Sequence, residues 1–210
     1  MNFSIYAILI GLPVLFTLVI VFGLRIRKKM FAKNLELKAA DLWPQIQDAR
    51  FELSGLLYGV WQDFSSTRLG MIVKDCRDQE VGKIIYRMAR REWILIECSE
   101  GNFAADSNAT TRLSISLRAA STEAGRSLCE FTRLAGGLYR FDAESLGILE
   151  SRSPRGLSLA PLFQYTLNGT PAGAGRPIGR WFARGRMLVL PNQLPLAIRL
   201  FVLAMQGQRS

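Results

Sequence analysis

The chain contains no histidine, and this absence excludes several kinds of chemistry. Without an imidazole there is no histidine general base, no serine–histidine dyad and no histidine ligand for a metal ion. The carboxylate pairs Glu97 with Glu100 and Asp75 with Asp78 lie in or beside predicted turns and indicate no acid–base site. The sequence therefore predicts a protein that is not an enzyme and that uses no cofactor and no metal.

Cysteine is scarce as well. The three cysteines lie at positions 76, 98 and 129, so their spacing matches neither a CxxC redox pair nor a zinc site. An odd number of cysteines also argues against a framework of disulfides. We expect reduced, buried thiols.

Acidic residues are missing from the end of the chain. The whole protein carries 27 Lys and Arg against 17 Asp and Glu, a net charge of +10. The last 60 residues hold +8 of this, from eight arginines and no acid: Arg152, Arg155, Arg176, Arg180, Arg184, Arg186, Arg199 and Arg209. Such an asymmetry indicates an anionic partner, either lipid headgroups or nucleic acid. The alternative is an arginine-rich surface that maintains solubility.

One long hydrophobic run stands near the start of the chain. Residues Ile5 to Leu24 carry no charge, and these 20 residues form a helix long enough for a hydrocarbon core of about 30 Å. Gly11 and Pro13 are tolerated in a membrane helix. A cleaved signal peptide is the alternative, but the first four residues have no positive charge and no small-x-small cleavage site follows. We assign residues 1–27 as a transmembrane anchor.

Basic residues follow this run on one side only, which predicts the orientation of the anchor. The N-terminus is expected outside and the C-terminal domain in the cytoplasm, as in a single-pass protein of the cell membrane. Residues 28–50 are interpreted as a basic juxtamembrane helical linker, with Asn34 as its N-cap and Pro44 as an interruption. The juxtamembrane basic residues are Arg25, Arg27, Lys28, Lys29 and Lys33.

Residues 51–210 have the pattern of a mainly β domain. Short apolar runs alternate with turn residues at intervals of about 8 to 12 residues, as in a sandwich or barrel. We interpret residues 100–102 as a turn and the glycine-rich segment 168–175 as a hairpin loop, because Arg176-Pro177 follows it where a phosphate-binding loop has Lys-Ser or Lys-Thr. About twelve strands are predicted, at residues 55–62, 68–74, 81–88, 93–98, 112–117, 127–133, 138–141, 146–151, 157–159, 163–167, 178–184 and 187–190.

The C-terminus departs from this pattern. Pro195 and Gly207 suit the start and the end of a helix over about Leu194 to Gln206. This helix is apolar nearly all round, with Arg199 as its one charge, so it must be buried on all sides. At roughly 13 residues it is too short to span a membrane. We therefore expect an antiparallel barrel that encloses a C-terminal hydrophobic helix.

Residues 55–206 resemble the tubby C-terminal-like superfamily, which includes tubby, phospholipid scramblase and LURP-one-related domains. The resemblance depends on residues 81–84 (VGKI), 178–181 (IGRW), 186–191 (RMLVLP) and 194–201 (LPLAIRLF). It implies a twelve-stranded barrel around a hydrophobic helix, and a module that binds lipid or protein. Scramblase activity is not expected, because this chain has no calcium-binding acidic loop, no cysteine cluster and no C-terminal membrane segment.

In tubby domains basic residues on the barrel surface bind phosphoinositides, and the best-placed group here surrounds residues 180–186. In an extended strand alternate side chains share a face, so the even positions are expected outside, with Trp181, Ala183 and Met187 toward the core. Guanidinium groups suit phosphate oxygens; a solvated strand face is the alternative. The predicted lipid-headgroup residues are Arg176, Arg180, Phe182, Arg184 and Arg186.

Two functions remain after these exclusions. One is a membrane-tethered module that binds anionic, phosphoinositide-like lipid headgroups on the cytoplasmic side. The other is a structural or docking component of a membrane protein assembly, whose partner is a protein. Nucleic acid is not an expected partner, because the chain has a single run of mixed aromatic and basic residues and is anchored.

Overall fold

The computed structural model divides into two compact units, Met1–Glu36 and Leu37–Ser210. The predicted anchor lies outside the described residues except for Val21, which is helical. Within the described part of the chain, no helix has both the length and the apolar character needed to cross a membrane. The described residues are 21, 29, 31–33, 36–46, 50–65, 68–87, 92–107, 114–120, 127–143, 146–152, 161–179 and 184–206.

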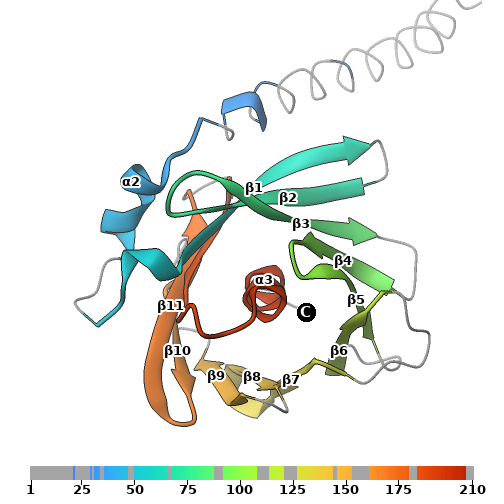
Figure 1. Cartoon of the computed structure of the whole chain (residues 1–210), viewed down its shortest axis with the longest axis vertical. Coiled ribbons are helices and arrows are strands. Elements are labelled where there is room, and N and C mark those ends of the chain that lie inside the picture. The colour runs from blue at the N-terminus through green and yellow to red at the C-terminus, as the bar shows by residue number, and fades with distance from the viewer. Residues whose placement is uncertain are drawn as a thin grey trace, which may run out of the picture. The chain divides into compact units, whose positions relative to one another are not determined.

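The second unit contains a closed barrel of twelve antiparallel strands, which confirms the predicted architecture (Figure 1). Each strand pairs with its neighbours in sequence, and β1 pairs with β12 to close the barrel. The strands are β1 Leu56–Ser65, β2 Arg68–Asp75, β3 Glu80–Arg87, β4 Glu92–Cys98, β5 Gly101–Ser107, β6 Ser114–Ala119, β7 Cys129–Leu134, β8 Leu138–Ala143, β9 Gly147–Arg152, β10 Phe163–Leu167, β11 Thr170–Ile178 and β12 Gly185–Val189. Short 3₁₀ helices precede β1 (η2, Leu53–Gly55) and β8 (η3, Ala135–Gly137).

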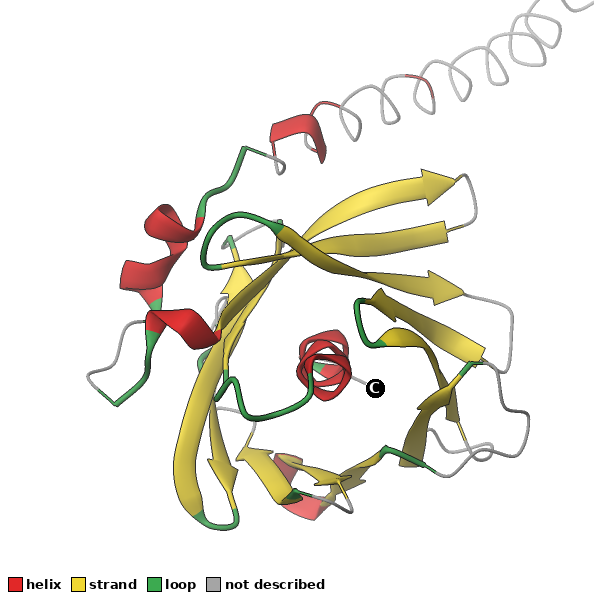
Figure 2. Cartoon of the chain, in the orientation of Figure 1, coloured by secondary structure: helices red, strands yellow, loops and turns green. Residues whose placement is uncertain are grey.

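The C-terminal helix α3, Leu196–Met205, lies inside the barrel (Figures 1 and 2). Eight of its ten residues are buried, and Leu200 and Phe201 are fully inaccessible to solvent. They belong to the large core that the inward-facing side chains of the strands complete. The predicted helix is therefore confirmed to within two residues at its start, and it occupies the interior where a bound lipid would otherwise lie.

A second, smaller core lies on the outer face of the barrel. We call residues 37–46 the strap; they contain α2 (Ala39–Leu42) and the 3₁₀ helix η1 (Trp43–Gln45). Pro44 stands in the first turn of η1, where its missing N–H costs nothing. The strap buries Ala39, Leu42 and Ile46 against outward-facing residues of β1, β11 and β12, namely Leu56, Tyr58, Val60, Ala174, Ile178, Met187 and Val189.

The strap changes the predicted division of the chain. The compact unit that contains the barrel begins at Leu37, so much of the segment 28–50 that we assigned to the linker packs on the barrel. It also explains why β1 and β12 are apolar on both faces, because an antiparallel strand usually exposes one face to water. Within the strap, α2 ends at Leu42 and the 3₁₀ helix η1 begins at Trp43. The predicted N-cap Asn34 lies outside the described residues.

Two strands were missed by the sequence analysis. β5 begins at Gly101, which we had placed in a turn, and β11 covers most of the segment that we had interpreted as a hairpin loop. The predicted strand 178–184 was placed too late, because β11 ends at Ile178. Residues 180–183 and the predicted strand 157–159 lie outside the described residues.

All three cysteines are free, as expected. Cys129 is buried, and burial raises the pKa of its thiol to about 12. Cys76 and Cys98 are half-buried. A thiol with so high a pKa stays protonated at neutral pH and behaves as a small apolar side chain.

Because Leu200 is fully inaccessible to solvent, shortening its side chain must leave a cavity. We expect Leu200→Ala to lower the free energy of unfolding by about 2–5 kcal/mol. Leu162, which is 43% exposed, is the matched control, and Leu162→Ala should change this free energy by no more than about 0.5 kcal/mol. Denaturant unfolding of the full chain in detergent micelles measures both. Equal effects of the two substitutions would contradict an interior helix.

Candidate functional site

Arg186 of β12 points into the barrel and binds the C-terminal end of α3. Its Nη1 donates hydrogen bonds to the carbonyl oxygens of Leu203 (3.2 Å) and Ala204, and to the hydroxyl of Tyr86 (3.3 Å). Its guanidinium carbon lies 5.4 Å from the centre of the Trp61 ring. A cation at this position satisfies helix carbonyls that lack partners within the helix and opposes the negative end of the helix dipole.

This position corrects one part of the sequence analysis. We had placed Arg186 on the outer face of its strand and Met187 toward the core, and the two are reversed: Met187 belongs to the outer cluster beneath the strap. The alternation of side chains is as expected, but its phase is not. The Arg186 side chain is thus engaged inside the barrel and is not available on an outer basic face.

Tyr86 of β3 reinforces the same end of the helix. Its hydroxyl donates to the carbonyl oxygen of Ala204 at 2.9 Å, and its ring lies 5.5 Å from that of Trp61. Burial raises the pKa of this phenol, although the charge of Arg186 opposes the shift. Tyr86 therefore stays neutral and keeps its proton for the helix carbonyl.

Glu100 satisfies the opposite end of α3. The N-cap position is occupied by Pro195, which has no side-chain acceptor. The carboxylate of Glu100, in the turn between β4 and β5, accepts hydrogen bonds from the backbone N–H groups of Leu196 (2.8 Å) and Ala197 (2.9 Å). Burial lowers the pKa of Arg199 in the next turn, and the Glu100 charge opposes that shift.

We assigned no role to Glu100 from the sequence, because we had considered only acid–base chemistry for its carboxylate. A usable signal was present: a buried helix that begins at proline needs an acceptor from elsewhere in the chain. Nothing in the local sequence, however, identifies which turn supplies that acceptor across 96 residues.

The strap is held at its two ends in the same way. Asp78, in the β2–β3 turn, accepts hydrogen bonds from the N–H of Ala39 (2.7 Å) and from the hydroxyl of Tyr58 (2.6 Å). At the other end, Nη1 of Arg176 donates to the carbonyl oxygen of Gln45 at 2.9 Å. A carboxylate at the first turn and a guanidinium at the last carbonyl are again the arrangement that a helix dipole favours.

The ionisation of the Asp78–Tyr58 pair follows from these contacts. Desolvation is the largest single influence on Asp78 and raises its pKa. The hydrogen bonds from Tyr58 and Ala39, together with the charges of Lys74 and Lys38, outweigh it, so the net shift of the pKa is downward. Burial, followed by the hydrogen bond to Asp78, raises the pKa of Tyr58. The carboxylate is therefore charged and the phenol neutral over the whole neutral range.

The remaining predicted lipid-contact residues are not gathered into one described patch. Arg176 lies on the outer face beside the strap, and Arg184 is half-buried, with its N–H bonded to the carbonyl of Ile178 (2.8 Å). Arg180 and Phe182 lie outside the described residues. Of the predicted juxtamembrane residues, Lys29 and Lys33 are exposed, whereas Arg25, Arg27 and Lys28 lie outside the described residues.

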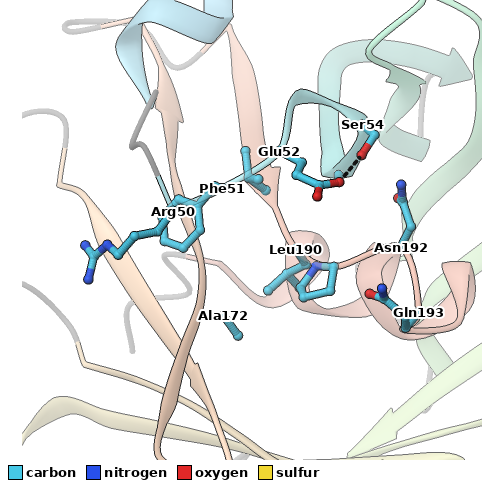
Figure 3. A pocket seen from close by; sticks show the side chains of 11 residues that line it. Arg50, Phe51, Glu52, Ser54, Ala172, Leu190, Asn192 and Gln193 are labelled. Atoms are coloured by element: carbon cyan, nitrogen blue, oxygen red, sulfur yellow. Dashed lines mark hydrogen bonds between the residues drawn. The ribbon is translucent and has the colours of Figure 1, made fainter.

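A cavity of about 270 Å³ opens at the rim of the barrel (Figure 3). It lies between the segment Arg50–Gly55, which leads into β1, and the segment Val189–Gln193, which leads from β12 toward α3. Ala172 of β11 completes the lining. The sequence analysis did not find this cavity, because its walls come from segments about 140 residues apart that carry no motif.

Comparisons of the chain with protein-family models, with curated proteins and with solved structures give no match.

The carboxylate of Glu100 should contribute measurably to stability. We expect Glu100→Ala to lower the free energy of unfolding by about 1–2 kcal/mol, as for the loss of an N-cap. It should also speed hydrogen exchange at the amides of Leu196 and Ala197. Glu97, on an exposed position of β4, is the control, and Glu97→Ala should change neither quantity. Unchanged exchange in the Glu100 variant would exclude the proposed capping.

Docking of the strap should depend on pH in a defined direction. The pKa of Asp78 is lowered in the folded chain, so its ionised carboxylate stabilises the docked strap at pH values above the usual carboxyl pKa. This contribution to stability is lost as the pH falls through the lowered pKa of Asp78. We expect Asp78→Asn to reduce protection of the Ala39 amide at neutral pH and to remove the acid-dependent step. Amide exchange followed over acidic pH measures both effects.

The matched control for this experiment is Asp142, an exposed carboxylate of β8. Asp142→Asn should leave the pH dependence of the strap unchanged. If both variants lost the acid-dependent step, or neither did, the role assigned to Asp78 would be wrong.

Proposed function

We propose that this chain is a non-catalytic β-barrel module that a single N-terminal helix tethers to the cell membrane. The N-terminus lies outside, the barrel lies in the cytoplasm, and the outer surface of the barrel binds anionic lipid headgroups. The anchor rests on the uncharged run Ile5–Leu24 and on the basic residues that follow it.

The observation that carries the proposal is the filled interior of the barrel. α3 occupies it, and both ends of α3 are hydrogen-bonded, by Glu100 and by Arg186. An enclosed lipid chain would have to displace this helix from the core, which disfavours a lipid carrier. Binding through the outer surface is what remains.

The charge of the last 60 residues supports an anionic lipid as the partner. Three arginines of this segment already donate hydrogen bonds to oxygen atoms of the chain itself, namely Arg176, Arg186 and Arg199. Arg152 is exposed at the end of β9. The last 60 residues contain no acid, so this segment carries a basic excess.

The architecture also supports the proposed family. A twelve-stranded barrel around a C-terminal hydrophobic helix is what the resemblance to the tubby C-terminal-like superfamily implies. We propose membership of that superfamily, with a phosphoinositide-like headgroup as the ligand and Arg180, Phe182 and Arg184 as the principal contacts.

A docking component of a membrane assembly is the second candidate. The observation in its favour is the outer face of β1, β11 and β12, which already binds a short helical segment, the strap. The same barrel surface is thus suited to helical peptides, and a protein partner would use similar contacts.

Vesicle binding tests the function. Residues 37–210, the compact unit with the barrel, should bind vesicles that contain anionic lipid and should dissociate as salt is raised. Arg180→Gln with Arg184→Gln should weaken binding about 25-fold, since each arginine near the surface contributes about 1 kcal/mol. The control Arg77→Gln removes an exposed charge of the β2–β3 turn and should bind nearly as the parent does.

The full chain serves as the second arm of this experiment. It should stay with vesicles of any charge at high salt and in alkaline carbonate, because the anchor spans the bilayer. Release by carbonate would exclude the anchor. Equal binding of residues 37–210 to neutral and anionic vesicles, or none, would exclude lipid recognition.

A further inference from the structure

The strands of the barrel alternate in direction, so the barrel has two ends that receive different residues. At one end, which we call the entry end, the odd-numbered strands begin, the even-numbered strands finish, and the chain passes from β12 into α3. At the other, the far end, the odd-numbered strands finish and the even-numbered strands begin. Figure 1 views the barrel along α3, so that one of these ends is turned toward the reader.

Charge is divided unequally between the two ends. Each end comprises the three residues of every strand that lie nearest to it and the described residues between those strands; the entry end also includes residues 50–55, which lead into β1. The far end contains eight bases and four acids: Arg68, Arg87, Arg133, Arg140, Arg152, Arg176, Arg184 and Arg186, with Asp63, Glu92, Asp106 and Glu150. The entry end contains four bases and eight acids: Arg50, Lys74, Arg77 and Arg118, with Glu52, Asp75, Asp78, Glu80, Glu97, Glu100, Glu130 and Asp142. The net charges of these residues are +4 and −4.

The remaining segments between the strands increase this difference in the sequence. Those that join strands at the far end contain no acid and five arginines, namely Arg90, Arg91, Arg112, Arg155 and Arg180. Those that join strands at the entry end contain two acids and one base, namely Glu123, Glu144 and Arg126. The division of charge therefore follows from the order of the strands and does not depend on one run of arginines.

The two ends lie far enough apart to act separately on a charged surface. Strands β8 and β9 have six residues each. At about 3.3 Å per residue and a tilt of about 40°, such a strand spans roughly 15 Å along the barrel axis. The electrostatic screening length at physiological ionic strength is about 8 Å. An anionic surface near the far end is therefore attracted by its arginines with little opposition from the acids of the entry end.

Exposed side chains at the far end combine positive charge with apolar groups. Arg152, the last residue of β9, is exposed, and its Cα partner on β8 is Leu138. Leu134, opposite Leu138 on β7, is exposed as well, and Leu162, just before β10, is 43% exposed. Guanidinium groups bind phosphate oxygens, and apolar side chains enter the boundary between headgroups and acyl chains.

The entry end also exposes leucines, which are Leu53 and Leu128. These two leucines, however, lie within two residues of the exposed acids Glu52 and Glu130. An anionic surface repels such carboxylates. Charge, and not apolar exposure, is therefore what distinguishes the two ends.

We propose that the far end is the face with which the barrel lies against an anionic membrane, and that the entry end is turned away from it. This inference rests on the proposed binding of anionic lipid and adds the orientation of the barrel to it. The partner is a bilayer surface that presents phosphate and carboxylate groups. Attraction at the far end and repulsion at the entry end favour the same orientation.

Quenching by spin-labelled lipid tests the orientation with the full chain in nanodiscs. A thiol-linked fluorophore is placed at the far end in Leu162→Cys or at the entry end in Leu53→Cys; these leucines are 43% and 42% exposed. The labelled parent chain is the baseline for the native cysteines. In discs that contain phosphatidylserine, we expect loss of emission at position 162 and little loss at position 53. The difference should disappear in discs of phosphatidylcholine alone and at high salt.

The possible results separate the orientation from lipid binding itself. Stronger quenching at position 53, or equal quenching at both positions, would overturn the orientation and leave the binding of anionic lipid standing. Quenching at neither position would overturn both. A difference that persists in phosphatidylcholine discs would show that charge is not its cause and would also overturn the proposal.

Two exposed arginines at opposite ends provide a matched pair of variants, Arg152→Gln at the far end and Arg77→Gln at the entry end. Arg152→Gln should shift the barrel about fivefold away from the membrane-bound orientation, as expected for the loss of one basic residue near an anionic surface. Arg77→Gln should cause no such shift. The salt dependence of quenching at position 162 measures both variants, and a larger effect of Arg77→Gln would contradict the assignment of the far end.

Discussion

A helix inside a closed barrel needs partners for its terminal N–H and C=O groups, above all at the end of α3 where Leu203 and Ala204 are fully inaccessible to solvent. In this protein Glu100 bonds the first amides of α3, and Arg186 with Tyr86 bonds its last carbonyls. An unpaired buried backbone group would cost about 1–3 kcal/mol, so these contacts determine whether the apolar helix can lie inside. The strands then supply the apolar wall that its side chains require. Gly175 of the wall lies close to the residue after α3, because a Cβ there would lie 2.3 Å from the side-chain nitrogen Nε2 of Gln206.

The strap extends the same principle to the outer surface. Asp78 and Arg176 bond the two ends of its short helical segment, and its apolar residues cover β1 and β12. The polypeptide that leads from the predicted anchor is therefore fixed to the barrel from Leu37 onward. In the proposed function, a shorter free tether would raise the local concentration of the barrel at the membrane, so that weak headgroup contacts would suffice.

The general architecture was predictable from the sequence, because an apolar segment too short to span a membrane has to be enclosed. Most strands were predictable from their turns. β5 and β11 were missed because they are built from small residues, such as Ala104, Ala105, Gly173 and Gly175, which have low β-propensity. The phase of β12 was not predictable, because Met187 and Leu188 are both buried, one under the strap and one inside. Alternation identifies the inner face only where the outer face is polar.

The position of Arg186 also changes how the basic C-terminus must be interpreted. A count of arginines treats every one as part of a binding surface, yet Arg186 is required inside, Arg176 holds the strap, and Arg199 bonds Asn192. Each of these arginines bonds a fixed oxygen of the chain, so its donor groups hold a helix end or a loop and are not available for direct contact with a headgroup. Its positive charge still adds to the field around the protein. In the proposed function, the contacts to anionic lipid therefore have to come from basic residues other than these three.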